Sequence, residues 1–80
     1  MKLQILLFGI TTDLLGTSSI ELNLSENSTV SDLKFALVTN HPVLEKLKAY
    51  AVAVNETYAQ DNIVLKPNDV VAIIPPVSGG

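Results

Sequence analysis

The residues best suited to chemistry in this chain lie at its carboxyl end, which reads Pro75-Pro76-Val77-Ser78-Gly79-Gly80. Glycine has no Cβ, so a diglycine end can enter a narrow channel and adopt backbone angles closed to other residues. The two prolines have fixed φ angles and would direct the tail stiffly away from a folded domain. On the assumption that Gly80 ends the natural chain, its carboxylate is an unhindered reactive group, and Gly79 gives it access to another enzyme's active site. A frayed, inert tail is the alternative.

Side-chain catalysis has few candidates in the rest of the chain. There is no cysteine, which excludes disulfides, thiolate metal sites and a catalytic thiol. The single histidine, His41, precedes Pro42 and is interpreted as a turn residue, so a Ser-His-Asp triad is not indicated. No glycine-rich phosphate-binding motif is present.

Two other short patterns are better explained by local structure. The segment Ser31-Asp32-Leu33 differs in order from the Asp-Ser-Leu that carries phosphopantetheine in small helical carriers, and we interpret it as the start of a helix. The pairs Asp61-Asn62 and Asn68-Asp69 lack the spacing of a calcium-binding loop and are interpreted as turns. Neither pattern predicts a metal or cofactor site.

Charged residues are scarce for a chain of this length. They make up 16% of the 80 residues, whereas hydrophobic residues make up 48%, and a typical soluble domain carries ~25% charge. The eight acids outnumber five lysines, arginine is absent, and the net charge is −3. This balance argues against binding to nucleic acid or to a membrane surface, since both need basic clusters. The chain has the length of one domain, with either an unusually apolar core or a surface that a partner covers.

The amino-terminal segment 1–10 is a lysine followed by mostly apolar residues. Gln4 interrupts that run and no cleavage site precedes Asp13, so a signal peptide is not indicated. No stretch approaches the roughly 18 apolar residues of a transmembrane helix. We therefore expect a soluble, cytoplasmic protein.

Hydrophobic periodicity predicts four strands and one main helix. The strands cover 3–8, 20–24, 51–54 and 70–74, and the helix runs from Thr29 to Asn40. Thr29 and Asp32 resemble a capping box, and Pro42 suits the first turn of a second, shorter helix. Segment 9–16 is expected to be a connection, 57–62 a loop, 63–65 a brief pairing segment and 66–69 a turn.

The order strand-strand-helix-strand-strand predicts an α+β fold. The continuous apolar run Val70–Ile74 is typical of a central strand with a parallel neighbour, and pairing it with 3–8 gives a β-grasp, ubiquitin-like sheet. We expect a mixed sheet of four to five strands with the helix on one face. One domain would cover 1–77, followed by a flexible tail over 78–80.

Alternation along the strands separates two apolar sets. One set faces the helix and forms the core: Leu3, Ile5, Leu7, Leu33, Leu37, Val71 and Ile73. The other set points to the opposite side and continues towards the tail: Leu6, Phe8, Val70, Ile74, Pro75, Pro76 and Val77. We expect this second face to bind a partner, and the alternative is that it fills a second small core.

The element order and the tail together resemble the MoaD-like sulfur carriers, the small subunits of molybdopterin synthase. The family's Pro-Pro-Val-[Ser/Thr]-Gly-Gly ending is matched at every position. Segments that support the resemblance are Phe8–Gly16, Thr29–Leu33, Ala51–Asn55, Leu65 and Asp69–Ala72. Two segments depart from it. Thr12-Asp13 stands where the first loop commonly has Arg-Glu, and Pro67-Asn68-Asp69 stands where the last turn commonly has Asp-Gly-Asp.

The resemblance implies a role as a sulfur carrier. The Gly80 carboxylate would be adenylated with ATP by an enzyme resembling ubiquitin E1 and converted by a sulfur donor to a thiocarboxylate. The tail, Ser78 included, would enter the large synthase subunit, in a heterotetramer of two small and two large subunits. It would there donate sulfur to cyclic pyranopterin monophosphate in molybdenum cofactor biosynthesis. Catalytic side chains would lie in the large subunit, so this chain would bind no cofactor and would not be an enzyme by itself.

Other functions fit the same features. A sulfur carrier for thiamine thiazole, tRNA thiolation or cysteine synthesis shares the fold and the diglycine end. A ubiquitin-like modifier would have Gly80 joined to a lysine of another protein. A plain β-grasp interaction module would carry an inert tail.

Overall fold

Five strands form a single mixed sheet in the order β2-β1-β5-β3-β4. The computed structural model describes residues 1–47 and 49–75. In chain order the elements are β1 (Lys2–Leu7), α1 (Ile10–Leu15), β2 (Ser19–Asn23), α2 (Val30–Asn40), the 3₁₀ helix η1 (Pro42–Lys46), β3 (Ala51–Val54), β4 (Thr57–Tyr58) and β5 (Val70–Ile74). The predicted boundary at residue 77 lies outside the described residues.

The strand pairing gives the β-grasp arrangement expected from the sequence. Strands β1 and β2 are an antiparallel hairpin, and β5 lies parallel to β1, with Ile5 opposite Val71. On its other side β5 pairs antiparallel with β3. The most apolar strand is thus the central one, as its continuous run of hydrophobic residues predicted.

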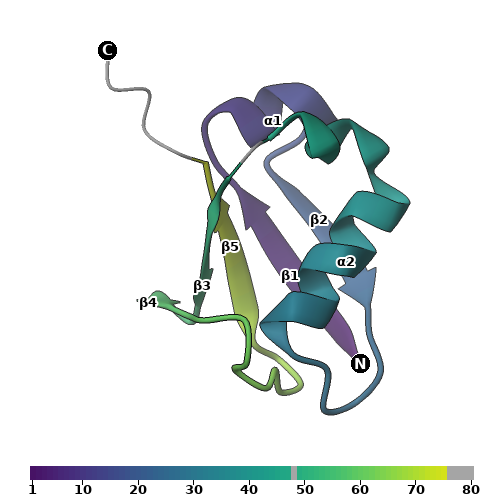
Figure 1. Ribbon diagram of the computed structural model, residues 1–80, viewed down its shortest axis with the longest axis vertical. Coiled ribbons are helices and arrows are strands. Elements are labelled where there is room, and N and C mark those ends of the chain that lie inside the picture. The colour runs from purple at the N-terminus through teal and green to yellow at the C-terminus, as the bar shows by residue number, and fades with distance from the viewer. Residues whose placement is uncertain (48, 76–80) are drawn as a thin grey trace.

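The core lies between α2 and one face of the sheet, as Figure 1 shows. Every residue that alternation assigned to the core is at most 3% exposed. From the sheet these are Leu3, Ile5, Leu7, Val71 and Ile73, and from the helix Leu33 and Leu37. The prediction of the core is confirmed, and the opposite face of the sheet has no helix over it among the described residues.

Helix α2 begins and ends where the sequence predicts. Thr29 is its N-cap: the Asp32 amide donates to the Thr29 hydroxyl at 3.3 Å, and the Thr29 amide donates to the Asp32 carboxylate at 2.9 Å. This reciprocal pair satisfies two amides that the first turn cannot bond. The helix ends at Asn40, and Pro42 opens η1, which is a 3₁₀ helix.

Two connections differ from their predictions. Segment 9–16 contains the short helix α1, which Gly16 ends in the left-handed conformation with φ 70°. Its Leu14 and Leu15 pack against the core, so tertiary contacts stabilise a helix too short to show periodicity. Segment 57–62 begins with the two-residue strand β4. Within 63–65 the pairing reduces to one bridge, between Val64 and Thr29.

No helix among the described residues is long and apolar enough to cross a lipid bilayer.

Candidate functional site

The reactive end predicted from the sequence lies partly outside the described residues. The structure does not describe the last five residues, so their predicted roles stay predictions: Pro76, Val77, Ser78, Gly79 and Gly80. The structure describes the point from which the tail departs, because β5 ends at Ile74 and is followed by the half-buried Pro75.

Pro75 packs against the loop that follows β1. Because β1 and β5 are parallel neighbours, their carboxyl ends lie at the same edge of the sheet. A Cβ placed on Gly9 would lie 3.0 Å from Pro75 Cγ, closer than carbon atoms normally approach. Gly9 also has φ 57° and ψ −134°, a conformation that only glycine adopts readily. Gly9 therefore allows the loop to lie directly against the base of the tail.

Threonine side chains hold this loop in place. Thr11 is fully buried, and its Oγ1 both accepts from the Phe8 amide at 3.0 Å and donates to the Phe8 carbonyl. The Thr12 hydroxyl donates to the Leu7 carbonyl at 3.1 Å. The peptide groups on both sides of Phe8 are thus satisfied locally. Thr12, one of the positions that depart from the family resemblance, therefore makes a contact within the chain.

The uncovered face of the sheet carries an apolar hollow between the end of β1 and the start of β5. The strand register aligns Leu6 on β1 with Ala72 on β5, and Ala72 with Ala53 on β3. A depression of about 460 Å³ lies here, and the small side chain of Ala72 is part of its lining. It is lined by Leu6, Phe8, Asn55, Glu56, Val70 and Ala72.

The hollow accounts for most of the described residues that the sequence assigned to a partner surface. Leu6, Phe8 and Val70 line it together, and Phe8 and Val70 are 49% and 38% exposed. Ile74 shares their face of β5 by alternation but does not line the hollow. No helix or loop of the described chain closes this depression, so these side chains do not form a second core. Binding of a partner to them stays a prediction.

Sequence reasoning missed three residues of the hollow. Ala72 lies between Val70 and Ile74 in the alternation, so the pattern that identified its neighbours could have identified it. Asn55 and Glu56 occupy the turn between β3 and β4. These two turn residues line the hollow because β3 pairs with β5, and the sequence alone does not predict that pairing.

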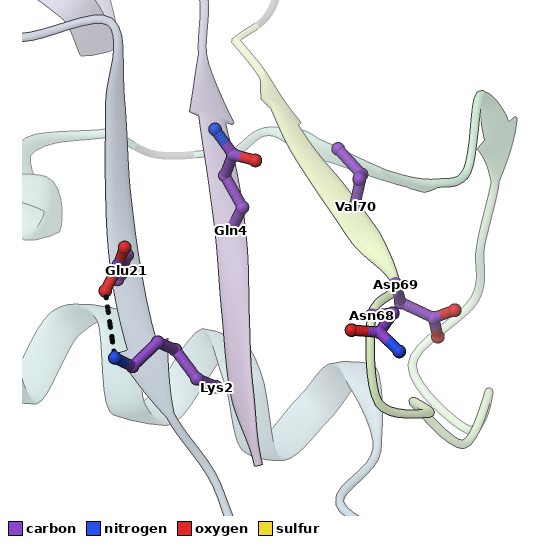
Figure 2. Close-up of a pocket in the computed structure, with 6 residues that line it drawn as sticks. All are labelled: Lys2, Gln4, Glu21, Asn68, Asp69 and Val70. Carbon is purple, nitrogen blue, oxygen red and sulfur yellow. Dashed lines mark ion pairs between the residues drawn. The ribbon is translucent and has the colours of Figure 1, made fainter.

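The other half of the same face is polar. Figure 2 shows a second depression in which Lys2 and Glu21 point toward one another, with Asn68 and Asp69 across from them near the start of β5. The Lys2 and Glu21 side chains are 3.6 Å apart and about two-thirds exposed, so this ion pair contributes little to stability. The uncovered face is thus polar where β1 begins and apolar where β1 ends.

The remaining sequence candidates have structural roles. Asp69 accepts from the Lys66 amide at 2.8 Å, and Asn68 has φ 71° within this turn. The Ser31 amide donates to the Asp61 carbonyl at 3.0 Å at the start of α2. No group of three or more His, Cys, Asp or Glu side chains in the described part of the chain could hold a metal ion.

Among the described residues, Tyr50 has a side chain whose pKa is shifted by its environment. Burial raises the pKa of its phenol; the Lys34 ammonium, 5.6 Å from the ring centroid, lowers it, and the Asp61 carboxylate raises it. Lys34 and Asp61 form an ion pair at 2.7 Å. Tyr50 packs against the core and does not line the hollow, so this shift belongs to the structure and not to the candidate site.

A family profile and a curated relative both match this chain over nearly its whole length. Residues 5–80 match the sequence profile of the ThiS family. The chain is 35% identical to the molybdopterin synthase sulfur carrier subunit of Arabidopsis thaliana, over 100% of this chain and 84% of that protein.

Solved structures similar to this one share the same architecture. The small archaeal modifier protein SAMP1 from Haloferax volcanii has a TM-score of 0.89 at 27% identity, with 100% of both chains covered. A putative molybdopterin converting factor, subunit 1, from Pyrococcus furiosus has a TM-score of 0.86 at 28% identity, covering 96% of this chain and 99% of that one. The β-grasp fold predicted from the sequence is confirmed.

Proposed function

The chain belongs to the ThiS family, and from this premise we propose that it is the sulfur carrier subunit of a molybdopterin synthase. The relative from Arabidopsis thaliana bears that name, and the similarity covers the whole chain. The observation that carries the proposal is the apolar hollow on the uncovered face of the sheet. It extends from Val70 and the β3–β4 turn to Phe8, which directly precedes the Gly9 that lies against Pro75. The chain would thus present its reactive end next to a docking surface.

The proposed chemistry takes place at the Gly80 carboxylate. A carboxylate oxygen attacks the α-phosphate of ATP on an E1-like enzyme, which forms an acyl-adenylate and releases pyrophosphate. Sulfur from a donor then attacks the acyl carbon and AMP leaves, so a thiocarboxylate remains. The thiocarboxylate sulfur then bonds to cyclic pyranopterin monophosphate. Water attacks the acyl carbon and breaks its bond to sulfur, so the sulfur stays on the pyranopterin and the carboxylate is regenerated. ATP and the sulfur donor act on the tail only transiently, and no cofactor is bound by this chain.

The uncovered face would bind the large subunit of the synthase. Burial of a whole phenylalanine side chain stabilises by about 1.5–3 kcal/mol, and half of Phe8 is already covered, so its contact would contribute about 1 kcal/mol. Leu6, Val70 and Ile74 add to the same surface, and Pro75 leads from it into the tail. We propose an assembly of two small and two large subunits working in the cytoplasm, with the catalytic side chains in the large subunit.

Intact-mass measurement tests the carrier chemistry. The protein is incubated with the activating enzyme, ATP and a sulfur donor, and a mass gain equal to replacing one oxygen by sulfur is expected. A variant lacking Gly80 is the control and should gain nothing while keeping the same circular dichroism spectrum. An unchanged mass of the intact chain, or equal transfer by the deletion variant, would contradict the proposal.

Docking is tested by Phe8→Asp, with Phe35→Asp as a matched control. Phe35 is 77% exposed on α2, on the opposite side of the molecule from the hollow. Phe8→Asp places a charge in the apolar hollow and should lower affinity for the large subunit by at least about 100-fold, whereas Phe35→Asp should not change it. Equal binding by both variants, or unfolding of Phe8→Asp, would refute this surface as the docking site.

A protein modifier is the second candidate, because the similar structure from Haloferax volcanii is a small archaeal modifier protein. In that case Gly80 would form an amide with a lysine of another protein. The two functions share adenylation but differ in the acceptor. Conjugates that persist in denaturing electrophoresis favour the modifier, whereas sulfur transfer to the pyranopterin with added large subunit favours the synthase. Other sulfur-carrier pathways would show the mass gain without that transfer.

A further inference from the structure

The turn between β3 and β4 has an unusual residue at its second position. Asn55 and Glu56 form a two-residue hairpin connection with φ 50° and φ 71°. Positive φ at both positions is typical of a type I′ turn, for which Asn-Gly is the preferred sequence. Four non-glycine residues of the described chain have positive φ, and three of them are asparagines, which tolerate this conformation. Glu56 is the exception.

Contacts within the chain do not account for a glutamate at this position. Asn55 fixes the turn, since its side chain accepts from the Val70 amide at 3.0 Å and donates to Asp69 at 2.9 Å. In the described segments, the Glu56 carboxylate has neither a hydrogen bond nor an ion pair. The side chain is exposed, so it adds no core packing either. A residue held in an unfavourable backbone conformation without internal benefit points to an external role.

The position of Glu56 indicates that role. It lines the same hollow as Leu6, Phe8, Val70 and Ala72. The carboxylate therefore stands at the rim of an apolar depression, while the carboxylate of Asp69, the residue before Val70, accepts hydrogen bonds from Asn55 and from the Lys66 amide. An apolar floor with one free negative charge at its edge is complementary to an apolar side chain flanked by a lysine or arginine.

We propose that Glu56 is the charged contact of the hollow, and that it pairs with a lysine or arginine beside the apolar side chain that the large subunit inserts there. The inference rests on the proposed function, because the large subunit is the partner. The turn sets the position of the contact, because the hydrogen bond between Asn55 and the Val70 amide fixes the residue that precedes Glu56 at the edge of the hollow. Steering by this charge would make association depend on ionic strength.

The test separates charge from turn geometry. Glu56→Gln keeps the turn and removes the charge, and it should weaken binding to the purified large subunit about five- to tenfold in calorimetry, with a smaller salt dependence. Glu56→Gly supplies the preferred turn sequence and should weaken binding similarly while the unfolding midpoint rises by about 2–6 °C. Glu56→Lys should weaken binding at least about 100-fold by repulsion. Glu26→Gln is the control, because Glu26 is an exposed acid in the loop before α2 and the substitution changes the net charge by the same amount. It should not change binding.

The outcomes distinguish the two proposals. If the unaltered chain binds the large subunit and Glu56→Gln binds equally well at low and high salt, the assignment of Glu56 is wrong and the docking surface stands. If Glu26→Gln weakens binding as much as Glu56→Gln, only the overall charge matters and the assignment is again wrong. If the unaltered chain does not bind the large subunit at all, the proposed function itself fails.

Discussion

The contact between Gly9 and Pro75 leads to a quantitative prediction for Gly9→Ala. The substitution adds one methyl group at a residue with φ 57° and ψ −134°, and it places that group 3.0 Å from Pro75 Cγ. Residues held in such sparsely populated conformations cost about 1–3 kcal/mol, and the close contact with the proline ring puts Gly9→Ala at the upper end, about 2–3 kcal/mol.

Gly16→Ala is the matched control. Gly16 also has a positive φ, 70°, but a Cβ there would meet nothing within 4 Å. Only the backbone strain of the left-handed conformation remains, which is about 1 kcal/mol. For a domain of this size 1 kcal/mol corresponds to about 4–8 °C in the unfolding midpoint. We expect Gly16→Ala to lower the midpoint by about 4–8 °C and Gly9→Ala by at least twice as much.

A double-mutant cycle with Pro75→Ala isolates the contact. Pro75→Ala removes the ring atoms that face Gly9, so Gly9→Ala should cost about 1 kcal/mol less in that background, measured by urea denaturation. The effect of proline on the unfolded chain cancels in the cycle. The reasoning is refuted if Gly9→Ala costs no more than Gly16→Ala, or if its cost is the same with and without the proline ring.

Three further changes test other parts of the structure. Thr11→Val keeps the shape of a buried side chain but removes the hydroxyl that bonds both peptide groups of Phe8, so it should lower the free energy of unfolding by about 1–3 kcal/mol in urea denaturation. Asp32→Ala removes half of the capping box of α2 and should cost about 1 kcal/mol, measured in the same way. Tyr58→Phe leaves Tyr50 as the only tyrosine, and its phenol should titrate above pH 10 by ultraviolet absorbance, since burial raises its pKa. Because the folded state holds that proton more tightly, stability is retained below about pH 10 and falls as the pH rises through the folded pKa.

Each of these predictions has a result that contradicts it. A neutral Thr11→Val would mean that water replaces the hydroxyl at the end of β1. Asp32→Ala with unchanged stability would mean that the Thr29 hydroxyl alone caps α2. Titration of Tyr50 below pH 10 would mean that the Lys34 ammonium outweighs burial at the ring.

The sequence predicted the elements that have a strong internal pattern. Alternation along 3–8 and 70–74 separated core residues from outward residues, because successive side chains of a strand point to opposite faces whatever it pairs with. The cap of α2 was equally predictable, since the bonds between Thr29 and Asp32 span one helical turn. Helix α1 was not predicted, because it has six residues and depends on Gly9, Gly16 and packing against the core.

What the sequence determined by itself is therefore the core, the main helix and the set of apolar residues left on the outer face, together with the terminal glycines that could carry chemistry. What only the tertiary structure decided is how that face is shaped and what borders it. Register places Ala72 beside Leu6 in the lining of a hollow, and the pairing of β3 with β5 brings the turn residue Glu56 to its rim. The parallel pairing of β1 with β5 places Gly9 against Pro75. These contacts join residues far apart in the chain, whose mutual positions depend on long-range pairing and not on any local pattern.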